Sequence, residues 1–130
     1  MTNIRILIVD DHVKVRTQIS NRLSREGDLL IIGQAGSCEE INALSSEIKP
    51  DVVLIDPEMS DCEGLSGLEF VRDHFPEANI VVLTAVADTA MQVELRKVGV
   101  QNVLSKGIES QYLIHTIREV VTKKAYTNEH

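Results

Sequence analysis

The sequence has 130 residues, enough for one compact domain, and its 43% hydrophobic and 25% charged residues are proportions of an ordinary globular protein. No apolar run approaches the roughly 20 residues of a membrane-spanning helix, and the N-terminus lacks a signal-peptide pattern, so we expect no membrane partner. The net charge of −7 and the lack of tryptophan argue against direct binding of this chain to DNA or RNA.

Five short apolar runs, rich in β-branched residues, predict strands that are buried on both faces. Between and after them, apolar residues recur at intervals of three and four, which predicts amphipathic helices. The runs are Ile4–Val9, Leu29–Ile32, Val52–Ile55, Ile80–Leu83 and Val103–Leu104. The helical spacings, in chain order, are Val15, Ile19 and Leu23; Ile41, Leu44 and Ile48; Leu68, Val71 and Phe75; Met91, Leu95 and Val98; and Leu113, Ile117, Val120 and Val121.

The alternation of strands and helices indicates an α/β fold with a parallel sheet and helices on both faces. Five such units in so short a chain favour the flavodoxin-like doubly wound (βα)5 fold, with a five-stranded parallel sheet in the order 2-1-3-4-5. We expect the folded domain to span residues 1–124 and residues 125–130 to form a frayed polar tail.

Polar residues directly follow four of the five predicted strands. Asp10 and Asp11 follow the first run, Asp56 the third, Thr84 the fourth, and Lys106 closely follows the fifth. Ligands of open parallel sheets bind at the carboxyl ends of the strands. We therefore expect three carboxylates, a hydroxyl and an ammonium group to meet at one edge of the sheet.

Clustered carboxylates repel one another unless a cation lies between them, and hard oxygen ligands suit Mg²⁺. Asp10, Asp11 and Asp56 can hold this ion together with a backbone carbonyl near Glu58. Lys106 can pair with a carboxylate at rest and with a phosphoryl oxygen afterwards. Asp56 is the candidate nucleophile of aspartyl-phosphate chemistry.

With these residues in place, the chain resembles the receiver domains of two-component response regulators over nearly its whole length. The segments that carry the resemblance are Ile6–His12, Pro50–Met59, Ile80–Ala85 and Val103–Lys106. The resemblance implies Mg²⁺ at Asp10 and Asp11, phosphorylation of Asp56, a switch hydroxyl at Thr84, and a phosphate-pairing Lys106. It implies a sensor histidine kinase as phosphoryl donor, a cytoplasmic location, and a signalling switch rather than an enzyme, with slow autodephosphorylation at most.

Asp10–His12 and Leu30–Ala35 are similar to receivers fused to a LuxR-type helix-turn-helix domain. In that subfamily the DNA-binding domain follows the receiver, and this chain contains no such segment. The resemblance thus implies control of transcription through an effector domain outside this chain, and allows a homodimer on phosphorylation.

Three positions depart from the family pattern. Family members often carry Tyr or Phe where this chain has Val103, and a Pro with a cis bond where it has Gly107. We expect no aromatic rotamer switch at Val103, and a trans bond or an otherwise adjusted loop at Gly107. Met59-Ser60 replaces the frequent Met-Pro, and Gly64 and Gly67 leave the start of the third helix open by about a turn.

Three alternative functions compete with the receiver function. A phosphatase of the haloacid dehalogenase type needs a DxD spacing, which Asp10-Asp11-His12 lacks. A nucleotide or flavin module needs a glycine-rich loop, and none follows Val9. A pseudo-receiver, a protein-interaction module that signals without phosphate, is favoured slightly by Val103 and Gly107 and disfavoured by the intact set of acids, threonine and lysine.

The remaining polar candidates are interpreted as structural. Cys38 and Cys62 have neither a CxxC nor a zinc-site spacing, so we expect two reduced thiols. His12 is expected to be a surface residue at the start of a helix, and the Glu58 side chain a solvent-facing acid.

Overall fold

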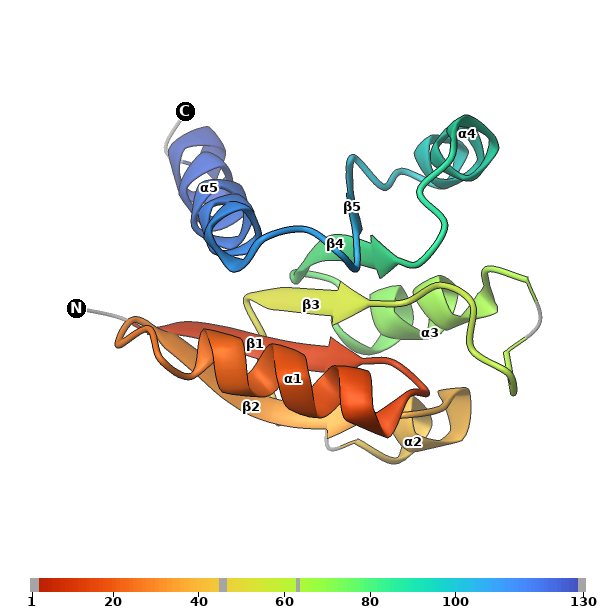
Figure 1. Ribbon diagram of the computed structural model, residues 1–130, viewed down its shortest axis with the longest axis horizontal. Coiled ribbons are helices and arrows are strands. Elements are labelled where there is room, and N and C mark those ends of the chain that lie inside the picture. The colour runs from red at the N-terminus through yellow and green to blue at the C-terminus, as the bar shows by residue number, and fades with distance from the viewer. Residues whose placement is uncertain (1–2, 45–46, 63, 129–130) are drawn as a thin grey trace.

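Five parallel strands form one sheet in the order β2-β1-β3-β4-β5 in the computed structural model, which describes residues 3–44, 47–62 and 64–128 (Figure 1). This order confirms the predicted doubly wound fold. The strands are β1 (Ile4–Val9), β2 (Leu29–Ala35), β3 (Val52–Ile55), β4 (Asn79–Thr84) and β5 (Asn102–Ser105).

In the described part of the chain, five helices cover the two faces of the sheet. Buried side chains of α1 and α5 belong to one core cluster, and those of α2, α3 and α4 belong to the other. The sheet is therefore the middle of three layers, which Figure 1 shows with α1 and α3 on opposite sides of it. The helices are α1 (Val13–Leu23), α2 (Cys38–Ala43), α3 (Ser66–His74), α4 (Thr89–Lys97) and α5 (Ser110–Asn128).

Strand β1 shows why the central strands are apolar without interruption. Ile6 and Ile8 pack in the cluster of α1 and α5, whereas Leu7 and Val9 point to the opposite face and pack in the cluster of α2, α3 and α4. All four are buried, because successive strand residues alternate between two covered faces. The β1–β3 register pairs Val9 with Ile55, so the residues that follow these strands lie side by side.

The two edge strands depart from the prediction of burial on both faces. Leu30 of β2 is 46% exposed, and no residue of β5 is fully buried. An edge strand has a neighbour on one side only, so the helices cover it less completely. Strand β2 also contains a bulge, where the register moves from Ile6–Ile31 to Leu7–Gly33, and it extends past the predicted end to Ala35.

Helix α2 is shorter than its apolar spacing predicts. It ends at Ala43, and Leu44 already has an extended backbone with ψ 141°, so the expected helix through Ile48 is wrong. Ile48 still packs against the core outside a helix. Helix α3 begins at Ser66 after Gly64, whose φ of 54° is left-handed and favours glycine. Helix α5 continues to Asn128, and the domain boundary at residue 124 stays a prediction.

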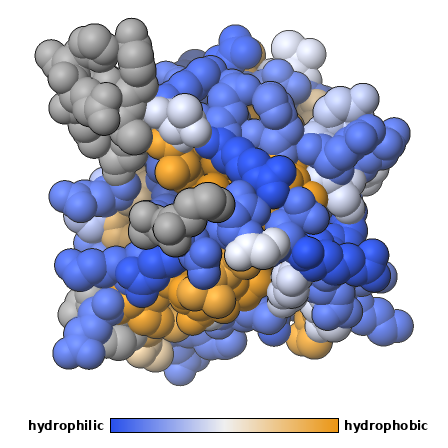
Figure 2. Space-filling model, turned by 90° about the vertical axis from the view of Figure 1, so that its left-hand side faces the viewer, coloured by the Kyte–Doolittle hydropathy of each residue, from blue (hydrophilic) through white to orange (hydrophobic). Residues whose placement is uncertain are grey.

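Within the described residues, no helix combines the length and the apolar character needed to cross a bilayer. Figure 2 shows the end of the molecule that lies on the left of Figure 1, away from the carboxyl ends of the strands. Hydrophilic residues cover much of this end, with hydrophobic side chains in patches between them.

Arg118 of α5 ties the C-terminal helix to the turn before β2. Its guanidinium donates to Asp28 Oδ1 at 2.8 Å and Oδ2 at 2.9 Å, and to Glu26 Oε1 at 2.9 Å. The hydrogen bonds from Arg118 hold the pKa of Asp28 below its usual 3.8. A carboxylate whose folded pKa is lowered stabilises the fold above its unfolded pKa and loses this effect as the pH falls through the folded pKa.

We therefore expect Arg118→Gln to lower the free energy of unfolding at neutral pH, with a deficit that shrinks as the pH falls below 3.8. Urea unfolding of the parent and the variant across this pH range measures it. A deficit that is equal at pH 7 and at acid pH would show that Arg118 acts through packing alone.

Candidate functional site

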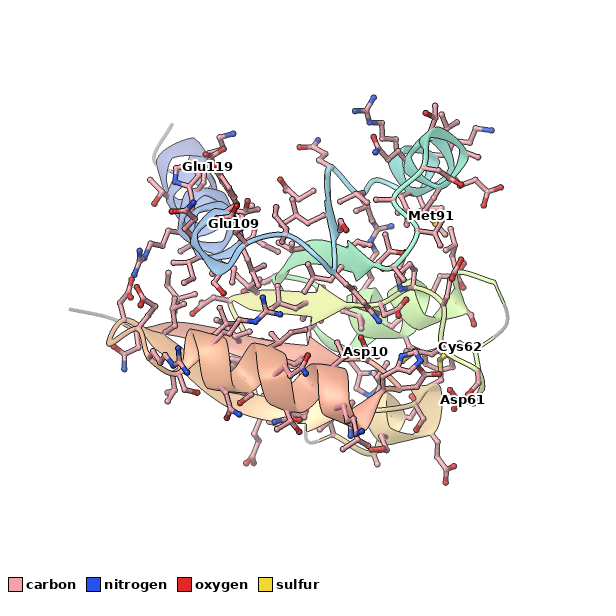
Figure 3. All side chains as sticks on the ribbon, viewed as in Figure 1. Asp10, Asp61, Cys62, Met91, Glu109 and Glu119 are labelled. Atoms are coloured by element: carbon pink, nitrogen blue, oxygen red, sulfur yellow. A yellow bond between two sulfur atoms is a disulfide. The ribbon has the colours of Figure 1, made fainter. Side chains whose placement is uncertain are left out.

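Three aspartates meet at the carboxyl ends of the two central strands and form what we call the acidic cluster: Asp10, Asp11 and Asp56. The backbone N–H of Asp56 donates to Val9 O at 2.9 Å, which continues the β1–β3 ladder and places both strand ends together. Asp10 is 2% and Asp56 is 5% exposed, so two carboxyl groups are nearly withdrawn from water. Figure 3 shows Asp10 at this edge of the sheet.

Lys106 reaches the acidic cluster from the end of β5. Its Nζ lies 2.7 Å from Asp10 Oδ2 and 2.6 Å from Asp56 Oδ2. The backbone N–H of Lys106 donates to Thr84 O at 2.9 Å, which fixes the start of this loop against β4. The predicted convergence of distant acidic and cationic residues is therefore present in the structure.

The charge of Lys106 is secured by its partners. Burial alone lowers the pKa of this ammonium group, but the hydrogen bonds to Asp10 and Asp56 outweigh the burial and raise the pKa above its usual 10.5. The lysine is thus charged at neutral pH, and its stabilising contribution is present below pH 10.5 and lost only as the pH rises through the raised pKa. Asp10 and Asp56 share this ammonium and Asp11 does not contact it, which leaves excess negative charge in the cluster.

Asp11 holds an oxygen that lacks a hydrogen-bond donor. Its Oδ2 accepts the backbone N–H of Ser60 at 3.0 Å, while its Oδ1 is buried without a hydrogen-bond partner. His12 Nδ1 lies 3.1 Å from this Oδ1, which is within ion-pair distance, but the two atoms do not form a hydrogen bond. A buried orphan carboxylate oxygen is costly unless a cation binds it.

One ligand atom from each of Asp10, Asp11, His12 and Asp56 lies within 4.8 Å of all the others, so the group can hold a metal ion. The contribution of His12 was not anticipated, because its exposed side chain reads as a surface residue. Its Nδ1 lies 3.0 Å from Asp10 Oδ1 and its backbone N–H donates to the same oxygen at 2.8 Å. Its position directly after two acids was the available signal.

Thr84 contacts Lys106 through its backbone carbonyl, and Glu58 contacts Asp56 through its backbone N–H. The Thr84 hydroxyl is buried and accepts the backbone N–H of Val86 at 3.2 Å. The backbone N–H of Glu58 donates to Asp56 Oδ1 at 2.9 Å, and its side chain is exposed as expected. The Glu58 backbone carbonyl as a metal ligand, and Thr84 as a switch hydroxyl, stay predictions.

Two backbone contacts that support the cluster are not predicted by the sequence. Arg16 of α1 donates to the backbone carbonyl of Asp10 and also reaches Gln34 Oε1 at 3.3 Å. The Ser60 N–H on Asp11 comes from a loop whose path the sequence leaves open. The bond before Gly107 is trans, as predicted from the missing proline.

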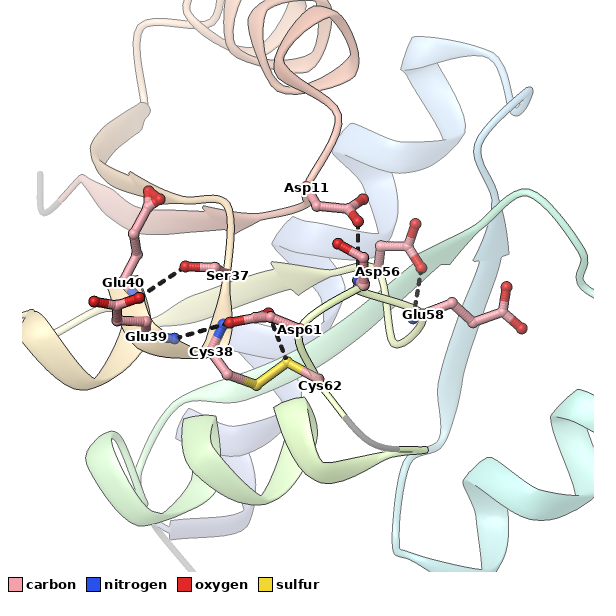
Figure 4. Close-up of a disulfide and its surroundings, with 10 residues drawn as sticks. Asp11, Ser37, Cys38, Glu39, Glu40, Asp56, Glu58, Asp61 and Cys62 are labelled. Carbon is pink, nitrogen blue, oxygen red and sulfur yellow. Dashed lines mark hydrogen bonds between the residues drawn. A yellow bond between two sulfur atoms is a disulfide. The ribbon is translucent and has the colours of Figure 1, made fainter.

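The prediction of two reduced thiols is wrong, because Cys38 and Cys62 form a disulfide (Figure 4). Cys38 is the first residue of α2, and Cys62 lies in the loop between β3 and α3. Their Cα atoms are 5.9 Å apart across 24 residues of sequence. Sequence spacing cannot reveal such a pair, because the fold alone brings α2 next to this loop.

A doubly wound α/β domain that gathers acids and a lysine at the carboxyl ends of its strands is an architecture suited to phosphoryl and metal ligands. The family model for the response regulator receiver domain matches residues 6–118. The chain therefore belongs to the response regulator receiver domain family. Receiver domains of response regulators are signalling modules of two-component systems.

Two relatives illustrate this membership. The chain is 32% identical over 123 residues to the response regulator GacA of Pseudomonas aeruginosa, covering 95% of this chain and 58% of GacA. It is 31% identical over 126 residues to the response regulator protein VraR of Staphylococcus saprophyticus, covering 97% of this chain and 58% of VraR. The chain thus spans less than two thirds of the length of these relatives.

Solved structures agree on the fold. The signal receiver domain of the response regulator NarL from Mycobacterium tuberculosis superimposes with a TM-score of 0.81 at 20% identity, over 94% of this chain and 98% of that one. RcsB from Salmonella enterica serovar Typhimurium, bound to a promoter, gives a TM-score of 0.79 at 19% identity, over 95% and 62%. Identities this low establish the shared fold alone.

Proposed function

We propose that this chain accepts a phosphoryl group on Asp56 from a sensor histidine kinase, with Mg²⁺ bound at Asp10, Asp11, Asp56 and the backbone carbonyl of Glu58. The observation that carries the proposal is the placement of Lys106 Nζ between Asp10 and Asp56, 2.7 and 2.6 Å from their oxygens. This arrangement positions one cation against the nucleophile and leaves further carboxylate oxygens for a metal ion.

The donor set of the acidic cluster fits Mg²⁺. Carboxylate and carbonyl oxygens are the ligands that this ion prefers, and it keeps several waters in its shell. The orphan Asp11 Oδ1 supplies a buried oxygen that a cation would satisfy. When bound, Mg²⁺ supplies positive charge that lets an anionic phosphoryl group approach three carboxylates.

Asp56, Lys106 and Thr84 each have a separate role in the phosphoryl transfer. An Asp56 carboxylate oxygen attacks the phosphorus of a phosphohistidine, the P–N bond breaks, and the imidazole leaves while an acyl phosphate forms on Asp56. Lys106 exchanges its carboxylate partner for a phosphoryl oxygen and neutralises its charge. The Thr84 hydroxyl leaves the Val86 backbone and donates to another phosphoryl oxygen.

Movement of Thr84 provides the output of the switch. The loop after Thr84 leads directly into α4, so displacement of the hydroxyl shifts this loop and helix between two populations. Water hydrolyses the acyl phosphate slowly and resets the domain. Val103, half-buried on β5 in place of an aromatic residue, supports an output that does not use an aromatic rotamer.

The relatives support a proposal for the setting of the switch. Because they extend well beyond the length matched here and RcsB is a promoter-bound regulator, we propose a cytoplasmic transcription regulator of the LuxR type. Its DNA contacts are made by a fused effector domain, and phosphorylation favours a homodimer. A pseudo-receiver that signals without phosphate is the competing function.

Incubation with acetyl phosphate and Mg²⁺, followed by intact-mass analysis, separates these functions. We expect one added phosphoryl group, about 80 Da, which disappears over time as the acyl phosphate hydrolyses. No mass gain under conditions that phosphorylate another receiver domain would favour the pseudo-receiver. Multiple rapid turnovers would indicate a phosphatase.

Asp11→Asn tests the metal site separately. Removing one negative charge from a dication site is expected to weaken Mg²⁺ binding by about tenfold or more, as measured by isothermal titration calorimetry. The amide oxygen can still accept the Ser60 N–H, and charge repulsion decreases, so stability without Mg²⁺ is expected to be unchanged or higher. Asp73→Asn, at an exposed position on α3, is the control that retains parental affinity. Equal affinities of Asp11→Asn and parent would contradict the assignment.

A further inference from the structure

The Cys38–Cys62 disulfide lies close to the acidic cluster along one short loop. Cys62 is two residues from Ser60, whose backbone N–H donates to Asp11 Oδ2 at 3.0 Å. Figure 4 shows the disulfide, Asp11 and Asp56 around this loop between β3 and α3. The chain has two cysteines in all, and both take part in this bond.

Three consecutive residues, Ser60, Asp61 and Cys62, each hold this loop by a contact with another segment. Ser60 binds the carboxylate of Asp11, and Cys62 is bonded to Cys38 at the start of α2. Between them, the carboxylate of Asp61 accepts the backbone N–H groups of Cys38 at 2.9 Å and Glu39 at 3.3 Å. The disulfide is the one covalent fastening among these contacts, and it closes the loop beside the residue that orients Asp11.

We propose that Cys38 and Cys62 form a reversible redox site whose disulfide holds the β3–α3 loop in the arrangement that orients Asp11, so that reduction weakens Mg²⁺ binding and slows phosphorylation of Asp56. The proposal rests on the function proposed above. In the cytoplasm, where thiols are kept reduced, a disulfide is more often a redox-responsive element than a permanent structural bond.

The two sulfurs differ in access, which sets the course of reduction. Cys38 is 6% exposed, whereas Cys62 is only partly buried against the core. A thiolate of a dithiol reductant attacks Cys62 Sγ, the S–S bond breaks, and its electron pair leaves on Cys38 Sγ, which takes up a proton. The second thiol of the reductant attacks the mixed disulfide and releases Cys62, so the reductant loses two electrons and becomes a disulfide.

Reduction changes the contacts of the loop as well as its covalent link. Cys62 Sγ lies 3.4 Å from Asp61 Oδ1, the same oxygen that accepts the N–H of Cys38. A disulfide sulfur has no proton to donate, whereas a free thiol is a weak donor, so reduction replaces the covalent link by no more than a weak hydrogen bond to this oxygen. A loop released in this way must be ordered again when Mg²⁺ binds, which costs affinity.

The experiment compares the parent protein after treatment with dithiothreitol and with oxidised glutathione. Alkylation followed by intact-mass analysis verifies the thiol count in each state, and calorimetry and acetyl phosphate measure Mg²⁺ affinity and phosphorylation rate. We expect the reduced protein to bind Mg²⁺ about threefold more weakly or worse, and to be phosphorylated more slowly at subsaturating Mg²⁺.

The double variant Cys38→Ser/Cys62→Ser is the matched control. It is expected to behave as the reduced parent in both buffers, and circular dichroism verifies that it folds. Equal Mg²⁺ affinity and equal rates in the two states of the parent would overturn the proposal while phosphorylation itself persists. If neither state accepts phosphate, the proposed function fails, and the Mg²⁺ affinities alone decide for or against redox control.

Discussion

Asp56→Asn is expected to abolish phosphoryl incorporation from acetyl phosphate and to leave the fold intact. A neutral amide is a poor nucleophile, so the attack on phosphorus has no group to carry it. The substitution preserves size, and the amide oxygen can still accept the backbone N–H that Glu58 donates to Asp56 Oδ1. Lys106 keeps its pairing with Asp10. Intact-mass analysis is expected to show a gain for the parent and none for the variant.

The control for Asp56→Asn is the same substitution at the exposed Asp73 of α3. This variant has the same net charge and is expected to gain one phosphoryl group at the parental rate. Far-ultraviolet circular dichroism and urea unfolding establish that both variants are folded. A mass gain of Asp56→Asn comparable with that of the parent would exclude Asp56 as the acceptor.

Lys106→Met is expected to lower both the stability and the rate of phosphorylation. Removing the ammonium group leaves Asp10 and Asp56 facing each other without their shared partner, and breaking a pair that is largely buried costs about 2–4 kcal/mol. The phosphorylation rate is expected to fall by about 100-fold, because one cation that neutralises the transferred group is lost. Urea unfolding and acetyl phosphate incorporation measure the two effects.

Mg²⁺ distinguishes this electrostatic effect from a loss of packing. A dication in the acidic cluster replaces part of the missing charge, so added Mg²⁺ is expected to stabilise Lys106→Met more than the parent. Lys97→Met, at an exposed position on α4, is the control that changes neither property. A stability deficit that Mg²⁺ leaves unchanged would indicate that Lys106 contributes through its aliphatic stem instead.

The central strands are predictable from the sequence because most of their residues are buried between two layers of helices. Every residue of β3, for example, is buried, so an uninterrupted apolar run identifies it. The edge strands and the end of α2 are less predictable, because their residues depend on neighbours that the local pattern does not contain. Leu44 and Ile48 continue the helical spacing, yet they pack against the core from non-helical backbone.

The candidate site also has a part that the sequence predicts and a part that it does not. Asp10, Asp56 and Lys106 could be named from the sequence, because the carboxyl ends of parallel strands share one edge whatever the loops do. The Ser60 N–H on Asp11 and the Cys38–Cys62 bond depend on the path of the loop after β3. No spacing rule specifies that path, so only the three-dimensional structure reveals the link between the disulfide and the acidic cluster.

The most direct measurement locates the phosphoryl group within the chain. Borohydride reduces an acyl phosphate on aspartate to homoserine, and peptide mass spectrometry identifies the residue that was converted. We expect conversion at Asp56 alone in protein treated with acetyl phosphate and Mg²⁺, and none in untreated protein. Conversion at Asp10 or Asp11, or a phosphorylated protein that borohydride leaves unchanged, would contradict the assignment of Asp56 as the phosphoacceptor.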